Sequence, residues 1–266
     1  DTASAEDVTA ALRAARHPGV PVTVIGNGSN LLVLDGGIRG LVLRLAGSCS
    51  AIRREGNLVL AQAGASLHAV PSFAQGQGLA GLAELTGIPG TIGGGSIMNA
   101  GAYGGELSQV VTRVDAIALS DGKPLSFSGP KLDFSYRHSA MMDAGVVVTD
   151  VTLSLSPGDP SALRERMEAL SRARREKQPL EYPSAGSTFK RPEGLFAARL
   201  IDECGLRGLR VGNAQVSEKH AGFIINLGGA TARDILTLIT EVTRRVQDAT
   251  GVHLEPEVRI LGEEAG

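Results

Sequence analysis

The first part of the chain alternates short apolar runs with glycine-rich turns. Residues 5–16 predict an amphipathic helix, because apolar side chains recur on one face and acidic residues open it. The stretch "VPVTVIG" (20–26) is an apolar, β-branched run that ends on glycine, as a buried strand does. Short strands follow in "NLLVL" and "GLVLRL", so the pattern predicts one helix and then a β-rich region.

Two hairpins and a long strand complete this region. "AIRREGNLVLAQAGA" (51–65) predicts a hairpin, and "VVTRVDAIALSDGKPLSFSG" (110–129) predicts a second one with an Asp-Gly turn. Between them, "SLHAVPSFAQGQG" is typical of a short helix that Ser66 caps. "GVVVTDVTLSLSPG" (145–158) predicts a long strand, and a domain boundary is expected near residue 157.

The remaining residues combine helical periodicity with short strands. A charged helix is predicted to start at Asp159-Pro160, and further helices are predicted over 195–206 and, capped by Thr231, over 231–251. Strands are predicted in "HAGFIINLGG" and "PEVRILG". Both parts of the chain therefore have α+β character.

Charge and hydropathy narrow the class of protein. The chain has 266 residues, with 26 basic and 28 acidic side chains and a formal charge of −2. Because its positive and negative charges nearly cancel, the chain as a whole does not attract nucleic acid or an anionic membrane electrostatically. An anionic ligand must therefore be held by local groups. No run approaches the roughly 20 apolar residues of a membrane span. We expect a cytoplasmic protein with no nucleic-acid or membrane partner.

The cysteines and the start of the chain add two expectations. Cys49 and Cys204 stand in no metal-binding or CxxC spacing, so we expect buried thiols and no metal site. The chain begins just before the first predicted helix and without Met, so we expect a leading segment to be missing.

Glycine is the unusual feature of the composition, with 35 residues, eleven of them within 76–105. Backbone of this kind turns tightly or closely approaches another group. In "GIPGTIGGGSIMNAGAYGGEL" (87–107) few side chains obstruct a large flat or charged ligand, which favours a binding loop over an elaborate turn. "GNGSNLLV" (26–33) either presents backbone N–H groups to a phosphate or simply turns between strands.

The common nucleotide-binding signatures do not apply. A literal G-x-G-x-x-G at Gly76, Gly78 and Gly81 follows a predicted helix rather than a strand, so a helix end and loop explain it better than a Rossmann turn. No G-x-x-x-x-G-K-[ST] sequence occurs, which excludes a P-loop.

Ser187 lies in "YPSAGSTFKRPEG" (182–194), on a predicted glycine-rich turn. The surrounding A-G-S-T-F is not the G-x-S-x-G of a hydrolase elbow, and the five histidines suggest no triad. Lys177, Lys190 and Arg191 flank the turn, which favours binding of an anion near Ser187.

Two further stretches, "FSYRHS" (134–139) and "LEPEVRILG" (254–262), place charged side chains beside strand residues. From spacing alone, a solvated strand edge explains Arg137, Glu257 and Arg259 better than a site does.

The ordered series "GNGSNLLV", "GIPGTIGGGSIMNAGAYGGEL", "FSYRHS", "GSTFKRP", "HAGFIIN" and "EPEVRILG" resembles the UDP-N-acetylenolpyruvoylglucosamine reductases, also called UDP-N-acetylmuramate dehydrogenases. The resemblance implies an FAD-binding region of the vanillyl-alcohol-oxidase type in residues 1–157, with subdomains at about 1–45 and 46–157. It implies a domain for the UDP-sugar substrate in residues 158–266. No long insertion separates Gly158 from Lys177, so the chain resembles the shorter subclass that lacks the tyrosine loop.

The same resemblance implies an activity in peptidoglycan synthesis, and with it a part in cell-wall biogenesis, cell shape and cell division. NADPH would reduce a non-covalent FAD and leave, and the UDP-sugar would then occupy the same side of the flavin. A monomer is expected.

By motif match, Ser187 falls on the proton-donating serine of the family, Arg137 on its active-site arginine and Glu257 on its C-terminal glutamate. The expected FAD contacts are Gly26, Asn27, Gly28, Ser29, Asn30, Leu31, Gly87, Ile88, Pro89, Gly90, Gly93, Gly94, Asn99, Ala100, Gly101, Ala102 and Gly104. The expected substrate contacts are Tyr136, Lys177, Lys190, Arg191, His220 and Arg259; at Arg191 and His220 the family also uses amides.

Two rival hypotheses differ in class. One is a nucleotide-sugar binding protein that has lost catalysis, against which the presence of Ser187, Arg137 and Glu257 argues. The other is a flavin-dependent oxidase of the same superfamily that acts on an alcohol or a sugar. Oxidation of NADPH under anaerobic conditions, with and without the UDP-enolpyruvyl sugar, separates reductase from oxidase.

Overall fold

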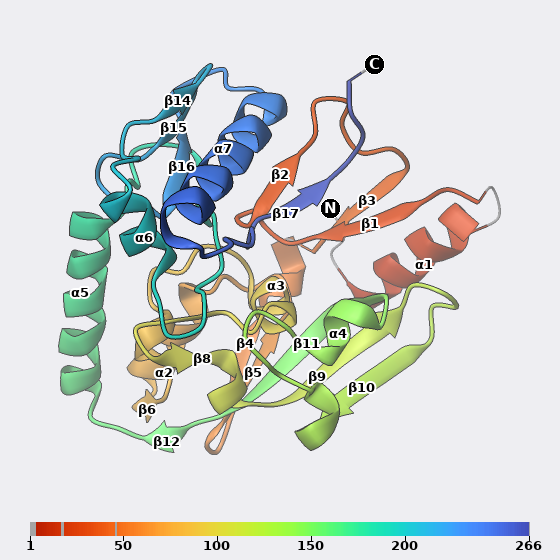
Figure 1. The fold of residues 1–266 in the computed structure, drawn as a ribbon. Coiled ribbons are helices and arrows are strands. Elements are labelled where there is room, and N and C mark those ends of the chain that lie inside the picture. The colour runs from red at the N-terminus through yellow and green to blue at the C-terminus, as the bar shows by residue number, and fades with distance from the viewer. Residues whose placement is uncertain (1–3, 17–18, 46, 266) are drawn as a thin grey trace. The chain divides into compact units, whose positions relative to one another are not determined.

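The computed structural model describes residues 4–16, 19–45 and 47–265 (Figure 1). The chain forms two compact units. The first comprises Asp1–Asn27 and Gly40–Arg172, and the second comprises Gly28–Arg39 and Ala173–Gly266. Among the described residues, no helix has the length and apolar character that a membrane crossing requires.

The first unit is built on a five-stranded antiparallel sheet in the order β10-β9-β11-β5-β4 (Figure 1). Its strands are β4 (Ile52–Glu55), β5 (Leu58–Gln62), β9 (Val111–Ala118), β10 (Pro124–Ser128) and β11 (Val146–Ser154). The two predicted hairpins and the predicted long strand are thus confirmed. Apolar side chains on these strands, among them Val59, Val114 and Val151, are buried in the core of the unit.

Shorter elements complete this unit. They are α1 (Ala5–Arg16), α2 (Ala69–Gly76), α3 (Ile92–Ile97), α4 (Ala140–Asp143), parallel β1 (Val22–Ile25) and β3 (Leu41–Arg44), and the antiparallel pairs of β6 (Leu79–Ala80) with β12 (Ser156–Pro157) and β7 (Gly101–Ala102) with β8 (Gly105–Glu106). Gly76 ends α2, as predicted, and the Ser66 hydroxyl accepts the N–H of Ala69 (2.9 Å). Cys49 in this unit is buried and free, and Cys204 in the other is half-buried and free.

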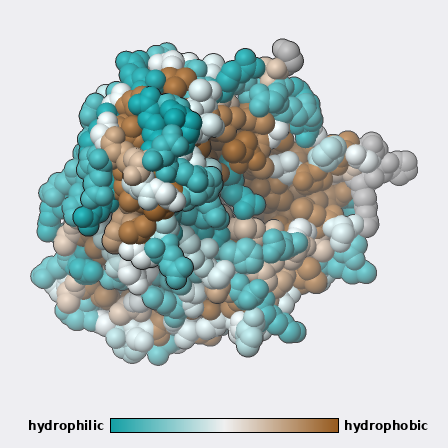
Figure 2. Space-filling view, viewed as in Figure 1, coloured by the Kyte–Doolittle hydropathy of each residue, from teal (hydrophilic) through white to brown (hydrophobic). Residues whose placement is uncertain are grey.

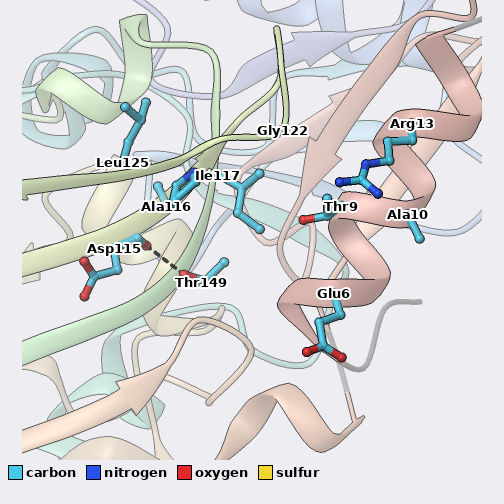
Figure 3. A pocket seen from close by; sticks show the side chains of 11 residues that line it. Glu6, Thr9, Ala10, Arg13, Asp115, Ala116, Ile117, Gly122, Leu125 and Thr149 are labelled. Carbon is cyan, nitrogen blue, oxygen red and sulfur yellow. Dashed lines mark hydrogen bonds between the residues drawn. The ribbon is translucent and has the colours of Figure 1, made fainter.

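A cavity of about 610 Å³ lies between α1 and the sheet of the first unit. Figure 3 shows Glu6, Thr9 and Arg13 of α1 facing residues of β9 and β11, where the Thr149 hydroxyl donates to the Asp115 carbonyl (3.1 Å). The cavity is lined by none of the residues expected to bind FAD or substrate.

The second unit contains a four-stranded antiparallel sheet, two helices and part of a third. The strands, in the order β13-β16-β15-β14, are β13 (Ser184–Ser187), β16 (Phe223–Asn226), β15 (Ala214–Val216) and β14 (Arg210–Val211). The helices are α6 (Ala197–Glu203), α7 (Ala232–Thr250) and the end of α5 (Pro160–Lys177), which begins in the first unit. Leu238, Val242 and Val246 recur at helical spacing on α7 and are fully buried.

The segment Gly28–Arg39 joins this second unit through long-range interactions. Its strand β2 (Leu31–Val33) pairs in parallel with the last strand, β17 (Arg259–Leu261). The Asp35 carboxylate accepts the N–H groups of Ala232 (2.7 Å) and Arg233 (3.1 Å) in the first turn of α7. Because this pairing spans most of the chain, local sequence patterns give no sign of it.

The two units differ from the predicted division in two places. The predicted boundary near residue 157 coincides with the end of β12, whereas the division of the structure falls within α5, between Arg172 and Ala173. Residues 28–39, expected within the first subdomain, belong to the second unit.

Figure 2 shows apolar side chains reaching the surface, and Val33 on β2 and Ile260 on β17 are among those exposed in the second unit.

We predict that Asp35→Ala lowers the free energy of unfolding by about 1–2 kcal/mol, because two N–H groups at the start of α7 lose a charged acceptor. Asp35→Asn keeps one acceptor oxygen and should lose less. Chemical denaturation followed by circular dichroism measures both. Glu193→Ala removes an exposed carboxylate of the same unit and serves as the control; an equal loss in that variant would assign the effect to charge alone.

Candidate functional site

Ser187 is the last residue of β13 and lies in a segment whose backbone is hydrogen-bonded to other segments on both sides. On one side Ser187 pairs with Phe223, and the Thr188 N–H donates to the Gly222 carbonyl (2.8 Å). On the other side the Glu257 N–H donates to the Thr188 carbonyl (2.8 Å). The predicted turn is therefore wrong, and Ser187 lies on a strand. Gly186, with φ of +77°, interrupts the register of this strand, which explains why its pattern resembles a turn.

The side chains of Ser187 and Thr188 have opposite surroundings. The Thr188 hydroxyl accepts the N–H of Ile224 (3.0 Å), and the residue is 3% exposed. The Ser187 side chain is exposed, and its hydroxyl has no hydrogen bond among the described residues. Thr188 thus fixes the backbone while the neighbouring hydroxyl stays available to a ligand.

Asn30 connects the loop 28–31 to the segment that carries Glu257. Its side-chain amide donates to the Glu257 carbonyl (3.1 Å), and its own carbonyl accepts the Arg259 N–H (3.0 Å). Ser187, Glu257, Arg259 and loop 28–31 therefore belong to one hydrogen-bonded part of the second unit.

The loop 28–31 has the features of an anion site. Gly28 has φ of +70°, and no atom lies within 4 Å of the position that a Cβ would take. The N–H groups of Gly28 and Asn30 have no acceptor among the described residues. Backbone N–H groups without a protein acceptor suit the phosphates of a nucleotide cofactor.

The expected cationic substrate contacts of the second unit are all at its surface. Lys190 donates to the Glu255 carboxylate (3.1 Å), and the Arg191 guanidinium lies 4.5 Å from the centre of the Phe196 ring. Lys177 is the exposed last residue of α5, and Arg259 is exposed on β17. Of these, Lys190 has its charge partly balanced by a neighbouring carboxylate.

His220 is held as a neutral ring. Its Nδ1 accepts the N–H of Gly222 (3.1 Å), and its ring meets that of Phe223 edge to face at 5.0 Å. Burial lowers the pKa of His220 below its ordinary value of 6.5, and the charge of Arg207 acts in the same direction. Because Nδ1 is an acceptor, the proton of the neutral ring is assigned to Nε2, which can donate to a ligand.

Arg137 belongs to the first unit, in a tight turn. Ser135 and His138 exchange two backbone hydrogen bonds (3.1 and 3.2 Å), so Tyr136 and Arg137 form the tip. Arg137 has φ of +57°, a backbone conformation that residues other than glycine rarely adopt. Its guanidinium donates to the carbonyls of Asn99 (3.4 Å) and Gly101 (3.2 Å) and lies 4.9 Å from the Tyr136 ring centre.

Asn99 supports this turn from inside the protein. It is fully buried, with φ of +44°. Its amide nitrogen donates to the Ser135 carbonyl (3.0 Å), and its amide oxygen accepts the Ser108 N–H (2.9 Å). The side chain expected to contact FAD is therefore engaged within the first unit.

The glycine-rich segment of the first unit contains α3, where we predicted a binding loop. Added Cβ atoms would come within 2.7 Å of Ala63 at Gly93 and within 3.0 Å of Leu67 at Gly95, so both glycines permit close packing. At Gly104 the position of an added Cβ is open, and at Gly94 the Thr91 hydroxyl lies 3.4 Å from it. Only some of the glycines in this segment thus leave the backbone accessible to a ligand, and the others permit close packing.

The first N–H groups of α3 are already paired within the protein. Those of Ile92, Gly93 and Gly94 donate to the Ala65 carbonyl (2.7 Å), the Ala63 carbonyl (3.0 Å) and the Thr91 hydroxyl (3.2 Å). These three N–H groups are therefore satisfied within the protein, unlike those of Gly28 and Asn30.

Gly26 brings the end of β1 next to Thr91, because an added Cβ would lie 2.9 Å from the Thr91 hydroxyl. This glycine, which was expected to contact FAD, therefore also has a packing role in the first unit.

Sequence reasoning missed the supporting roles of Thr188 and of the Asn99 side chain. Thr188 is adjacent to Ser187 in the quoted motif, but its burial depends on β16 and on residues 255–257. No local pattern reveals such partners.

Comparison with known proteins identifies both parts of the chain. The model of the UDP-N-acetylenolpyruvoylglucosamine reductase C-terminal domain matches residues 178–261, and that of an FAD binding domain matches residues 2–128. The predicted two-part α+β fold class is confirmed.

Full-length relatives agree with these matches. The UDP-N-acetylenolpyruvoylglucosamine reductase of Pediococcus pentosaceus is 52% identical over 250 residues, covering 94% of this chain and 83% of the relative. That of Clostridium novyi is 48% identical over 262 residues, covering 98% and 85%. The crystal structure of the Thermus caldophilus enzyme is 39% identical, with a TM-score of 0.83 over 97% of this chain and 89% of that one. The chain therefore belongs to the UDP-N-acetylenolpyruvoylglucosamine reductase family of FAD-binding oxidoreductases.

Proposed function

We propose that this chain reduces the enolpyruvyl ether of UDP-N-acetylglucosamine enolpyruvate to UDP-N-acetylmuramate in the cytoplasm, with NADPH as reductant, for peptidoglycan synthesis. The observation that carries the proposal is the exposed Ser187 hydroxyl, which has no hydrogen bond within the described part of the chain and lies on a strand bonded to the segment of Glu257. Identity of about half the residues over nearly the whole chain supports it.

Bound FAD would supply the hydride for the terminal carbon of the enolpyruvyl group. Loop 28–31 would hold the cofactor phosphates with the N–H groups of Gly28 and Asn30. Gly104 leaves the backbone open for the cofactor on the first unit.

Arg137, Ser187 and Glu257 would act on the substrate. After hydride addition, negative charge develops at the carbon beside the carboxylate, and the Arg137 guanidinium stabilises it electrostatically. The Ser187 hydroxyl then donates a proton to that carbon. A hydroxyl is a weak acid, but a carbanion is a strong base, so the transfer is favourable. Glu257 orients or shares this proton.

The remaining groups would bind the anionic and polar parts of the substrate. Lys177, Lys190, Arg191 and Arg259 carry positive charge for the diphosphate and carboxylate, and Tyr136 presents an exposed ring beside Arg137. Neutral His220 would donate from Nε2. We propose that the protein acts as a monomer and belongs to the shorter subclass.

The visible spectrum of the purified protein tests this function. We expect flavin absorbance that NADPH bleaches anaerobically and that the UDP-enolpyruvyl sugar restores. A colourless protein that takes up no FAD would contradict any flavin-dependent activity. Bleached flavin that only oxygen restores would indicate the oxidase instead.

We predict that Ser187→Ala leaves reduction of the flavin by NADPH intact and slows its reoxidation by the sugar by about two to four orders of magnitude. Stopped-flow absorbance separates these half-reactions. The matched control is Ser184→Ala, at the other exposed end of the same strand, which should behave as wild type. Equal loss of both half-reactions in Ser187→Ala would make Ser187 a structural residue.

We also predict that His220 makes stability fall in acid. Below the ordinary pKa of 6.5, the unfolded chain binds a proton at this residue that the folded chain does not, because burial lowers the folded pKa. The contribution is complete above 6.5 and declines as the pH falls. His220→Asn keeps an acceptor for Gly222 and should show a smaller drop in Tm than wild type between about pH 7.5 and pH 5.5.

The control for this experiment is His253→Asn, which removes an exposed imidazole from the same unit. If His253→Asn reduced the drop in Tm as much as His220→Asn, the change would not be specific to His220. An unchanged response in His220→Asn would mean that other groups govern the acid sensitivity.

A further inference from the structure

Among the residues that the structure describes, four other than glycine have positive φ, and all lie in two segments of the first unit. They are Asn99, Tyr103, Asp133 and Arg137, with φ between +44° and +57°. Each such residue costs of order 1 kcal/mol, so it persists only where surrounding contacts fix it. Segments 97–103 and 133–139 therefore hold each other in a specific conformation.

Hydrogen bonds join these segments along their length. Arg137 donates to the carbonyls of Asn99 and Gly101, and the Asn99 amide donates to the Ser135 carbonyl. The buried Ser139 hydroxyl donates to the Ile97 carbonyl (2.8 Å). The Asn99 amide thus holds the base of the turn whose tip carries Arg137, while its backbone carbonyl receives the guanidinium.

Asparagine suits this position for two reasons. It adopts the left-handed conformation more readily than most side chains. Its amide also satisfies an acceptor at Ser135 and a donor at Ser108 at the same time. Glycine would keep the backbone conformation and lose both contacts.

We propose that Asn99 is the positioning residue for Arg137, and that it sets the guanidinium geometry for the substrate half-reaction instead of serving FAD with its side chain. This proposal rests on the proposed function of Arg137. Misplacing a catalytic group by about 1 Å is enough to cost on the order of a hundredfold in rate.

The test compares Asn99→Gly with Ser139→Ala. Asn99→Gly should slow flavin reoxidation by the UDP-enolpyruvyl sugar by about tenfold to a hundredfold and leave FAD content and reduction by NADPH near wild type. Ser139→Ala removes an equally buried hydrogen bond between the same segments, one that involves neither the Asn99 amide nor the Arg137 guanidinium, and should retain the reoxidation rate. Equal loss in Ser139→Ala, or loss of FAD from Asn99→Gly, would overturn the proposal.

A double-mutant cycle shows whether Asn99 acts through Arg137. In an Arg137→Lys background, Asn99→Gly should slow reoxidation much less than it does alone, because the geometry that it sets is already lost. Fully additive effects would contradict the positioning role.

A second readout needs neither substrate nor turnover. Arginine Nε–H relaxation by NMR, with the Arg137 signal assigned from Arg137→Lys, should show an ordered side chain in wild type and Ser139→Ala and a mobile one in Asn99→Gly. An ordered Arg137 in Asn99→Gly would overturn the inference. Failure of the proposed function would appear separately, as wild-type flavin that the UDP-enolpyruvyl sugar does not reoxidise.

Discussion

The pairing of residues 255–261 with two distant segments is the constraint on which the second unit depends. Its first residues bond to Thr188 and Lys190, and its last pair in parallel with β2. A segment between two others fixes both, because its backbone groups have defined partners on each side. Ser187, Glu257 and loop 28–31 thus occupy set positions, although the loop and Ser187 are far apart in sequence. This one segment brings the candidate cofactor loop and the candidate proton donor into the same part of the unit.

Glycine serves several physical purposes that the sequence cannot distinguish. At Gly93 and Gly95 the missing Cβ permits α3 to pack against its neighbours, whereas at Gly28 and Gly104 the backbone needs positive φ in open space. The first purpose stabilises the fold, and only the second leaves room for a ligand. The start of α3 shows the difference, since its N–H groups have protein acceptors, whereas those of Gly28 and Asn30 have none among the described residues.

Local patterns predicted the longer helices and both hairpins, because these depend on neighbours in sequence, but they did not predict the short helices α3 and α4. Thr231 caps α7 and Asp159 accepts the Ala162 N–H (2.9 Å), as their positions before helical runs indicate. The candidate site was predictable only through the motif series. The strand at Ser187 escaped notice because Gly186 interrupts its alternation, and the place of residues 28–39 in the second unit depends on β17. Both features arise from partners far along the chain.

Backbone strain around Arg137 has a physical explanation in the partners of its side chain. Two carbonyls hold the guanidinium, and a carbonyl fixes a cation without cancelling its charge. At Lys190, the Glu255 carboxylate balances part of the charge at 3.1 Å. A cation that must stabilise transient negative charge benefits from a fixed position, since no reorganisation is then needed when the charge develops. The left-handed conformations of Asn99 and Arg137 are the cost of that arrangement, and the hydrogen bonds of the buried Asn99 amide offset it.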